Sequence, residues 1–333
     1  MLVLGIETSC DECSAAVVEN AEIIRSNVIL TQLVHEKYGG VIPELSSREH
    51  IKTITGVVEE ALEKANCSFG DIDIIAATHG PGLVGPLLVG LTFAKGLSFA
   101  LRKPFVPVNH MEGHICANYL AHPHLMKKHL ALIVSGGHTM LVDVRGIADY
   151  GLIAQTRDDA AGEAFDKISK LMGLGYPGGA IIDRLAKSGN PEFVKFPRAV
   201  RGEDDAFSFS GLKTSVALYL EKQTPAFIEQ HQADIAASFQ EAVVDALVDK
   251  TISAVQRLDA KHVGLTGGVA ANSRLRTRLT DALTPHGARL YFPPLSLCTD
   301  NAAMIAAAGF YRFETFGPGE LVANAIPSLS LFD

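Results

Sequence analysis

The sequence predicts an α/β protein with two lobes, each built on a copy of one strand-turn-strand unit. Three observations support this. The chain has 333 residues, more than one typical domain. Residues 2–18, LVLGIETSCDECSAAVV, place a polar turn between two apolar runs, and residues 130–144, LALIVSGGHTMLVDV, repeat the plan. Since apolar runs around a short turn are typical of paired strands, we expect each copy to open one lobe and its turn to face a shared cleft.

Composition limits the possible functions. A hydrophobic content of 47% is ample for buried cores, and the net charge of −8 argues against a protein that binds nucleic acid over its whole surface. The N-terminal MLVLGIETSC has neither a basic leader nor a long apolar run, so we expect a cytoplasmic protein without a membrane segment. The five cysteines fit reduced thiols, and Cys10-x-x-Cys13 has no second pair that would suggest zinc.

The next element is the glycine motif Gly80–Gly85, GPGLVG, which follows the apolar run DIDIIAAT. It matches the dinucleotide fingerprint G-x-G-x-x-G, but no carboxylate follows about twenty residues later to bind a ribose. Pro81 and Pro86 also remove two amide donors. We therefore predict a tight loop that packs a helix onto a sheet.

Residues 109–118, NHMEGHICAN, place His110 and His114 one helical turn apart, where they can share a metal ion. Glu112 lies two residues from each and, at about 100° per residue, points away from them, so the general base of an H-E-x-x-H protease is missing. Two hydrogen-bonded histidines without a metal remain the alternative. Asp300 in SLCTDNAAMIAAAGF could supply a third ligand for iron(II), zinc or manganese, or could cap a helix instead.

The remaining elements are mostly helical. Residues 150–258 contain DDAAGEAFDKISKLMGLGYPGGAIIDRLA, FSFSGLKTS and a long helical pattern from about Pro225. After them, LTGGVAANSRLRTRL predicts a strand, a glycine turn and a helix whose free N-terminal amides can face a nucleotide. Arg274, Arg276 and Arg278 near its start form a candidate basic patch for nucleic acid, although a solvated helix face explains the spacing equally well.

Together GIETSCDE, GGVIPELSSREH, GPGLVG, NHMEGH, VSGGHT, DDAAGEAFDK, YPGG, FSFSGLKT, TGGVAANSRLR and CTDNAAMIA resemble the bacterial-type tRNA N6-adenosine threonylcarbamoyltransferases (TsaD), formerly called glycoproteases or O-sialoglycoprotein endopeptidases. The resemblance covers about residues 3–312. It implies the duplicated fold of the actin-like, Hsp70-like and sugar-kinase (ASKHA) ATPases. We expect residues 1–108 with 302–333 to form the first lobe and 109–301 the second, with a helical insertion at about 150–258.

The resemblance also implies an activity and its site. The activity is transfer of threonylcarbamoyl from threonylcarbamoyl-AMP to N6 of adenosine 37 in tRNAs that read codons beginning with A. One divalent metal, most readily iron(II), would be held by His110, His114 and Asp300. The substrate-binding positions implied are Ile133, Val134, Ser135, Gly136, Gly137, Asp166, Gly179, Asp183 and Asn272. Asp11 and Glu12 in the first turn are candidate general bases, and the leaving phosphate is a third.

Implied partners are tRNA, the inactive paralogue TsaB and the small ATPase TsaE. A small-molecule kinase of the same superfamily is the alternative function, and a metalloprotease is a weaker one. A kinase would need no His/His/Asp set, and a protease would need the base that Glu112 cannot supply.

Overall fold

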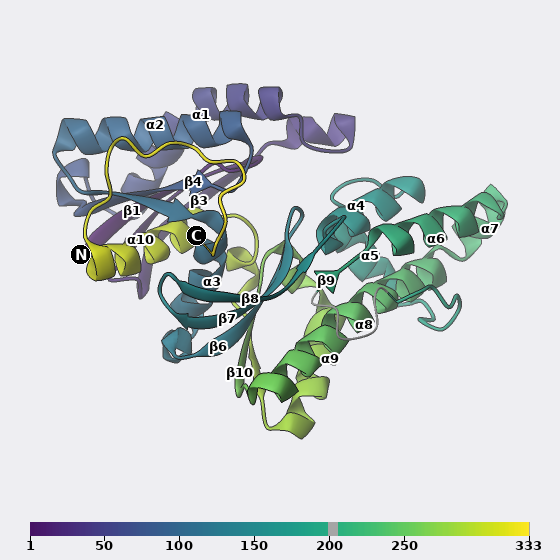
Figure 1. The fold of residues 1–333 in the computed structure, drawn as a ribbon. Helices are drawn as coiled ribbons and strands as arrows, with labels where there is room; N and C mark the ends of the chain where they lie inside the picture. The colour runs from purple at the N-terminus through teal and green to yellow at the C-terminus, as the bar shows by residue number, and fades with distance from the viewer. Residues whose placement is uncertain (199–205, 333) are drawn as a thin grey trace. The chain divides into compact units, whose positions relative to one another are not determined.

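The computed structural model describes residues 1–198 and 206–332, which divide into two compact units (Figure 1). The first unit comprises Met1–Lys127, Arg145–Tyr150 and Pro293–Asp333, and the second comprises Lys128–Val144 and Gly151–Phe292. The lobes expected from the sequence had other limits. Residues 109–127, 145–150 and 293–301, which we expected in the second lobe, belong to the first unit. There the helix His110–Ala121 packs against the helix Ala302–Phe316.

The first unit is built on a five-stranded sheet with the order β3-β2-β1-β4-β5. Its strands are β1 (Leu2–Glu7), β2 (Glu12–Glu19), β3 (Ile23–Thr31), β4 (Ile74–Gly80) and β5 (Phe105–Asn109). The strands β1, β2 and β3 form an antiparallel meander, whereas β4 and β5 continue the sheet in parallel on the other side of β1. The predicted first strand-turn-strand unit is therefore β1 and β2.

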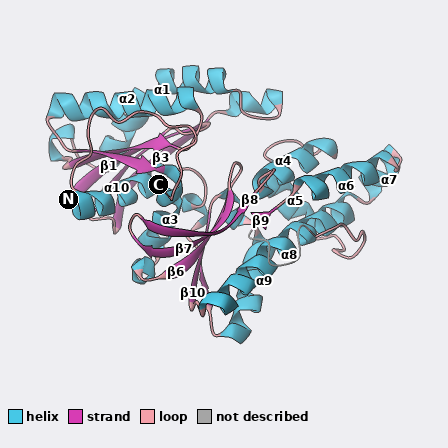
Figure 2. Ribbon diagram, viewed as in Figure 1, coloured by secondary structure: helices cyan, strands magenta, loops and turns pink. Residues whose placement is uncertain are grey.

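Helices cover both faces of this sheet (Figures 1 and 2). They are α1 (Pro43–Lys64), α2 (Val84–Leu101), α3 (His110–Ala121) and α10 (Ala302–Phe316), with short 3-10 turns at Leu33–Tyr38, Phe69–Asp71, Pro123–Met126 and Leu295–Leu297. Because side chains alternate along a strand, Leu4 and Ile6 face the core under α1 and α2, and Gly5 faces α10. A Cβ at Gly5 would lie 2.3 Å from the carbonyl oxygen of Ala302, so glycine here lets α10 lie directly on the sheet.

The GPGLVG loop joins β4 to α2 and packs against the turn after β1. The amide of Leu83 donates to the carbonyl of Ser9 at 2.8 Å, and a Cβ at Gly82 would lie 2.7 Å from the same oxygen. Gly82 has a φ of +157°, within the region that favours glycine. This agrees with the predicted packing loop.

Helix α2 is the one helix in the described residues that is long and apolar enough to cross a membrane, with a mean hydropathy of 1.6 over 18 residues. Core helices of globular proteins meet the same criterion. Here Leu87, Leu91 and Ala94 are buried, and α2 packs on β4 and α1. Helix α2 also carries the exposed side chains of Leu88 and Phe99.

The second unit contains a six-stranded sheet with the order β11-β10-β6-β7-β8-β9. Its strands are β6 (His129–Val134), β7 (Thr139–Gly146), β8 (Asp149–Thr156), β9 (Ala206–Phe207), β10 (His262–Thr266) and β11 (Arg289–Tyr291). As in the first unit, the opening strand pairs antiparallel with the next strand and parallel with a later one, since β6 lies between β7 and β10. The order β8-β7-β6-β10-β11 matches β3-β2-β1-β4-β5, which confirms the predicted duplication.

The helices of the second unit lie mostly in residues 150–258, the stretch predicted to be helical (Figure 2). They are α4 (Ala161–Leu171), α5 (Gly178–Ala186), α6 (Ser210–Glu221), α7 (Pro225–Gln230), α8 (Gln232–Leu258) and α9 (Ser273–Leu283), with 3-10 turns at Gly268–Ala271 and Thr284–His286. The strands β8 and β9 also fall in this stretch, and residues 199–205 of it lie outside the described residues.

Candidate metal centre

Two ligand candidates come from the first turns of α3. Asn109 caps this helix, because its side-chain oxygen accepts from the amide of Met111 at 2.9 Å. The helix therefore begins at His110, and His114 follows one turn later on the same side. Both side chains are buried, with 5% of His110 and none of His114 exposed. Their ring centroids are 4.8 Å apart at an interplanar angle of 78°.

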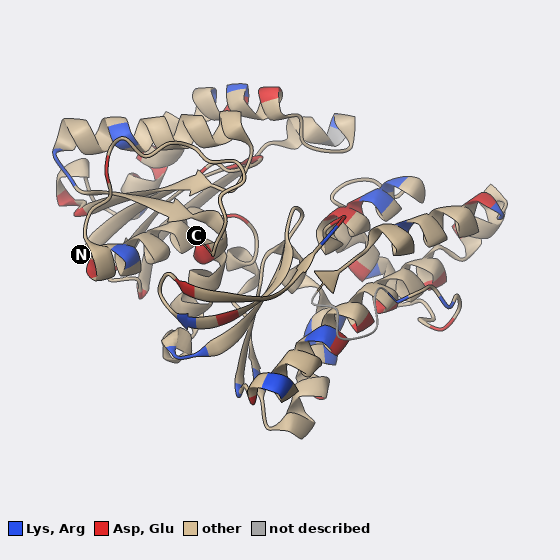
Figure 3. Cartoon of the chain, viewed as in Figure 1, with Lys and Arg blue, Asp and Glu red and all other residues tan. Residues whose placement is uncertain are grey.

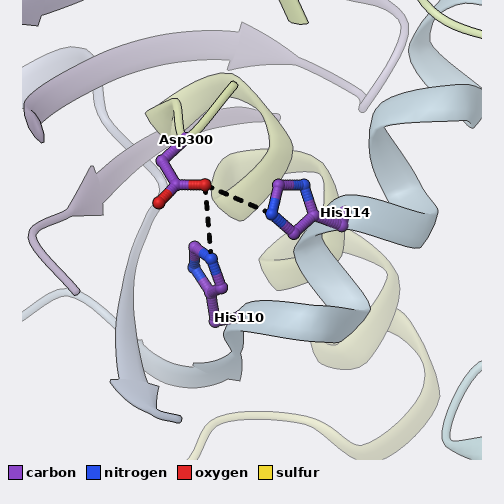
Figure 4. A group of neighbouring side chains, drawn as sticks. All are labelled: His110, His114 and Asp300. Atoms are coloured by element: carbon purple, nitrogen blue, oxygen red, sulfur yellow. Dashed lines mark ion pairs between the residues drawn. The ribbon is translucent and has the colours of Figure 1, made fainter. Parts of the chain in front are cut away.

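Asp300 completes the group from the segment before α10 (Figure 4). Its Oδ1 atom lies 3.4 Å from Nε2 of His110 and 3.2 Å from Nε2 of His114. Asp300 does not cap α10, which was the alternative role open to it. The neighbouring Asn301 does so instead, since its side-chain oxygen accepts from the amide of Met304 at 3.1 Å. The carboxylate of Asp300 is thus left to face the two imidazoles.

A glycine brings the two segments together. A Cβ at Gly113 would lie 2.7 Å from Cδ1 of Ile305 and 3.3 Å from Cγ of Met304, both on α10. The smallest residue type on α3 therefore faces the first turn of α10, and the close packing of the two helices holds Asp300 beside the histidines.

The donor set fits a divalent metal. One atom from each of His110, His114 and Asp300 can be chosen so that all lie within 4.8 Å of one another. Bonds of about 2.0–2.2 Å in a tetrahedral arrangement place ligand atoms about 3.3–3.6 Å apart. The 3.4 and 3.2 Å separations are close to this range. Two imidazoles and one carboxylate suit iron(II), zinc or manganese and leave coordination positions for substrate.

Charge interactions support the same arrangement. Burial disfavours the charged form of Asp300, but His110 and His114 outweigh burial and hold the pKa of this carboxyl well below its usual value. Burial likewise opposes protonation of His110, yet the carboxylates of Glu7 and Asp300 raise its pKa well above the usual value. In the metal-free protein a proton on His110 thus occupies the place that a cation would take.

We predict a pH dependence of metal binding from this proton. A metal at Nε2 of His110 must displace it, and the raised pKa of His110 extends this competition to higher pH. The dissociation constant for Zn²⁺ should fall about tenfold per unit rise in pH until the pKa of His110 is passed. Chelator competition between about pH 6 and pH 8 measures it. A constant that does not change with pH would show that His110 is not a ligand.

Glu112, the carboxylate between the two histidines, points elsewhere. It accepts hydrogen bonds from Tyr150 Oη at 2.8 Å, from Arg312 Nη1 at 2.8 Å and from the amide of Ala148 at 3.3 Å. Since the carboxylate is buried in these contacts, it cannot act on a water at the metal. This agrees with the prediction that Glu112 points away from the two histidines.

The turn after β1 contains the candidate bases. Burial raises the pKa of Glu12 well above its usual value, and the nearby carboxylates of Asp300 and Asp11 add to the effect. A hydrogen bond between Asp11 and Glu12 raises it further. Glu12 therefore holds its proton at a higher pH than an ordinary glutamate does.

The predicted substrate-binding turn of the second unit is open. Ile133 and Val134 end β6 and are buried, and Ser135 begins the turn, where its hydroxyl accepts from the amide of His138 at 3.1 Å. Gly136 and Gly137 are exposed, and a Cβ at either would meet no atom within 4 Å. These two glycines are therefore the exposed part of the turn.

The other predicted substrate residues form two local groups within the second unit. Asp166 on α4 accepts from the amide of Gly178 at 2.7 Å, which places it beside Gly179. Asp183 on α5 accepts from the amide and the hydroxyl of Ser273 at 3.1 and 2.9 Å. The adjacent Asn272 caps α9 and donates to Gln240 at 2.7 Å. Each polar side chain therefore has a partner in the protein and is held in a fixed orientation.

Arg274 and Arg276, the candidate tRNA contacts, are also engaged. The guanidinium of Arg274 makes two hydrogen bonds to Glu241, at 2.7 and 2.9 Å. Arg276 donates to the carbonyl of Ala270 and lies 4.2 Å over the ring of Phe292. Acidic and basic residues are interspersed along α8 and α9 (Figure 3). Arg274 and Arg276 thus also contribute to the packing of α9.

The sequence reasoning assigned no role to Glu7, although the structure places it in contact with His110. Glu7 Oε2 lies 2.9 Å from Nδ1 of His110, and Ser9 Oγ lies 3.3 Å from the same nitrogen. The signal available in the sequence was the position of Glu7 at the end of an apolar strand and directly before a polar turn. A carboxylate in that position is buried yet close to the strand end.

Comparisons with known proteins show the family of this chain. The family model "TsaD: tRNA N6-adenosine threonylcarbamoyltransferase" matches residues 23–307. The tRNA N6-adenosine threonylcarbamoyltransferase of Clostridioides difficile (strain 630) is 52% identical over 333 residues, covering 99% of this chain and 98% of the relative. The protein of the same name from Clostridium perfringens (strain 13 / Type A) is 50% identical over 332 residues, covering 99% and 98%.

Solved structures share the fold at low identity. HypF from T. kodakarensis aligns with a TM-score of 0.63 and 14% identity over 94% of this chain and 48% of that chain. Component A of the Acidaminococcus fermentans (R)-2-hydroxyglutaryl-CoA dehydratase aligns with a TM-score of 0.57 and 16% identity over 93% and 98%. The ROK hexokinase of Thermus thermophilus gives 0.51 and 16% over 95% and 99%.

The last three likenesses establish the duplicated ASKHA fold, and they do not bear on activity. The family match and the identities near 50% over the full chain do. Because the family model matches residues 23–307 and the two relatives are 52% and 50% identical over 99% of this chain, the chain belongs to the TsaD family of tRNA N6-adenosine threonylcarbamoyltransferases.

Proposed function

We propose that the protein transfers the threonylcarbamoyl group from threonylcarbamoyl-AMP to N6 of adenosine 37 in tRNAs that read codons beginning with A. The observation that carries the metal-assisted form of this proposal is the buried group of His110, His114 and Asp300, whose spacing fits a divalent cation. Iron(II) is the proposed metal, with zinc and manganese as the alternatives of matching ligand preference.

Acyl transfer from an adenylate requires a polarised carbonyl, a stabilised leaving phosphate and a positioned amine. A bound metal supplies Lewis-acid polarisation of substrate oxygens. Within the second unit, the exposed turn at Gly136 and Gly137 is suited to a phosphate, because such turns collect backbone donors. Asp183 of α5 contacts Ser273 at the start of α9, and Asn272 caps the same helix. The fixed orientation of both side chains suits ribose or threonyl hydroxyls.

Glu12 is the proposed acceptor of the proton that leaves the adenine amine. Its raised pKa gives a carboxylate that is more basic than an ordinary glutamate. Asp11, which is hydrogen-bonded to Glu12, and the leaving phosphate are the other candidates. Ile133 and Val134 end β6 and carry the turn, and Asp166 and Gly179 form the neighbouring part of the proposed substrate site.

We also propose that Arg274 and Arg276 contribute to tRNA binding. Replacing both with alanine should weaken tRNA binding and reduce the slope of log K against log salt by about 1.4–1.8, since each phosphate contact contributes about 0.7–0.9. Binding titrations at several salt concentrations measure this slope. Lys64→Ala removes one exposed positive charge from α1 and serves as the control. An unchanged slope in the double variant would place the tRNA elsewhere.

The inactive paralogue TsaB and the small ATPase TsaE are the proposed protein partners. The exposed side of α1 and α2 supports a protein contact. It carries the exposed apolar side chains of Ile51, Val84, Leu88 and Phe99. An apolar groove of about 620 Å³ lies between the two helices. A paralogue with the same fold presents equivalent helices, which favours a pseudo-symmetric pairing of the two.

A cytoplasmic location is proposed with the tRNA substrate, and the five free cysteines support a reducing compartment.

The test of this function is reconstitution. The purified protein is incubated with unmodified tRNA and threonylcarbamoyl-AMP, with and without TsaB and TsaE, and the tRNA nucleosides are analysed by mass spectrometry. We expect threonylcarbamoyladenosine only with both partners, and none when adenosine 37 is replaced by guanosine. Absence of the nucleoside in the complete mixture would contradict the proposal. Release of ADP and a phosphorylated product when the protein alone is incubated with ATP and small-molecule acceptors would instead support the kinase alternative.

A further inference from the structure

Glu7 is a fully buried carboxylate at the end of β1 with a complete set of partners. Its Oε1 accepts from the amide of Ser9 at 2.5 Å. Its Oε2 accepts from the hydroxyl of Thr78 at 2.5 Å and lies 2.9 Å from Nδ1 of His110. Three segments of the first unit therefore meet at this carboxylate: the turn after β1, strand β4 and the first residue of α3.

Two of these contacts fix the carboxylate and the third fixes the imidazole. The donors of Ser9 and Thr78 are attached to the sheet and its turn, so they set the position of Glu7 independently of α3. The carboxylate then accepts a hydrogen bond from one particular nitrogen of His110, Nδ1. Because Nδ1 is engaged in this way, Nε2 is the nitrogen that faces Asp300.

We propose that Glu7 is a positioning residue that holds His110 with its proton on Nδ1 and its Nε2 lone pair toward the metal. A metal-bound histidine usually donates its other N–H to a carboxylate or carbonyl, which fixes the tautomer and the ring orientation. Here Glu7 supplies the carboxylate, and α3 supplies the histidine. The inference rests on the proposed metal centre and adds a residue outside its ligand set.

The isosteric substitution Glu7→Gln gives a sharp test, because it reverses the hydrogen-bond pattern. The amide of Ser9 is a donor that requires the glutamine oxygen, which leaves the glutamine NH₂ group to face His110. That NH₂ group favours an unprotonated Nδ1 and a proton on Nε2, the nitrogen needed for the metal. We expect Zn²⁺ binding about 10–100-fold weaker than in the wild type.

The measurements use the whole protein and do not depend on transfer activity. Chelator competition gives the dissociation constant for Zn²⁺, and ¹³C and ¹⁵N NMR of the Zn²⁺-loaded protein reports which imidazole nitrogen binds the metal. In the wild type we expect His110 bound through Nε2 with a protonated Nδ1. In Glu7→Gln we expect this signal to weaken or shift.

Glu112→Gln is the matched control. Glu112 is the other fully buried carboxylate of the first unit that we have described, and it lies on α3 between the two histidines. Its contacts are to Tyr150, Arg312 and Ala148 and not to a ligand. The substitution should lower stability and leave the Zn²⁺ dissociation constant within about twofold. An equal loss of Zn²⁺ affinity in Glu7→Gln and Glu112→Gln would show that Glu7 has only a structural role.

If Glu7→Gln does not fold, Thr78→Val decides the matter. Valine keeps the shape of threonine but removes one hydrogen bond to Glu7, so we expect a several-fold loss of Zn²⁺ affinity. Unchanged affinity together with unchanged His110 signals would overturn the inference. If the wild type shows no Zn²⁺ binding that His114→Ala abolishes, the metal centre itself fails, which is a separate outcome.

Discussion

His114→Ala and Asp300→Ala are expected to abolish formation of threonylcarbamoyladenosine while the fold persists. Each substitution removes one of three ligand candidates. Even the loss of a supporting residue outside the ligand set commonly lowers metal affinity 10–100-fold, so the loss of a ligand should lower it by at least about 100-fold. His114 is preferred to His110 for this test. Removing His110 would also leave Glu7 buried without its ion-pair partner, and that would destabilise the protein for a second reason.

The measurement is nucleoside mass spectrometry of total tRNA from cells depleted of the protein and complemented with each variant, with metal content determined on purified samples. His124→Ala replaces an exposed histidine in the turn after α3 and should restore the nucleoside as the wild type does. Full restoration of the nucleoside by both His114→Ala and Asp300→Ala would contradict the proposed metal centre.

Gly5→Ala is expected to destabilise the first unit by about 3 kcal/mol or more, at the upper end of the cost of overpacking. The added Cβ would lie 2.3 Å from the carbonyl oxygen of Ala302 and 2.7 Å from the amide nitrogen of Ala306. Both are backbone atoms of α10, so no side-chain rotation relieves the clash. Because Asp300 lies two residues before Ala302, displacement of α10 should also weaken metal binding.

Gly56→Ala is the matched control for this prediction. Gly56 lies inside α1, and a Cβ there would meet no atom within 4 Å. Alanine at this position should stabilise the helix by up to about 1 kcal/mol. The Gly5→Ala and Gly56→Ala variants are compared by thermal unfolding without metal and by their Zn²⁺ affinity, measured on the same samples. Equal melting temperatures for Gly5→Ala and the wild type would mean that α10 does not pack as closely on β1 as described.

The strand-turn-strand units could be predicted because local sequence determines them. Apolar runs around TSCD and SGGH define two strands and a turn without reference to the rest of the chain. The helix with His110 and His114 was likewise readable from i, i+4 spacing. The roles of Asp300 and Asn301 were not, since both are good capping residues at adjacent positions. Only the packing of α10 shows that Asn301 caps and Asp300 faces the imidazoles.

The limits of the lobes depend on long-range packing that sequence patterns do not report. Helix α3 follows β5 and precedes β6, so either unit could have held it. The close approach of Gly113 to Ile305 ties α3 to α10 in the first unit. The hydrogen bonds of Asp183 to Ser273 and of Arg274 to Glu241 could not be foreseen for the same reason. Each joins two residues that lie far apart in the sequence.

The position of α10 in the chain affects when the metal centre can form during synthesis. The histidines lie on α3, in the first half of the chain, whereas Asp300 precedes the last helix. At about 5–20 residues per second, the ribosome needs on the order of ten seconds or more to pass from one to the other. Until then the groove above Gly5 lacks the helix that fills it, and the two histidines lack their carboxylate. The ligand set is therefore completed only after the whole second unit, which ends at Phe292, has been synthesised.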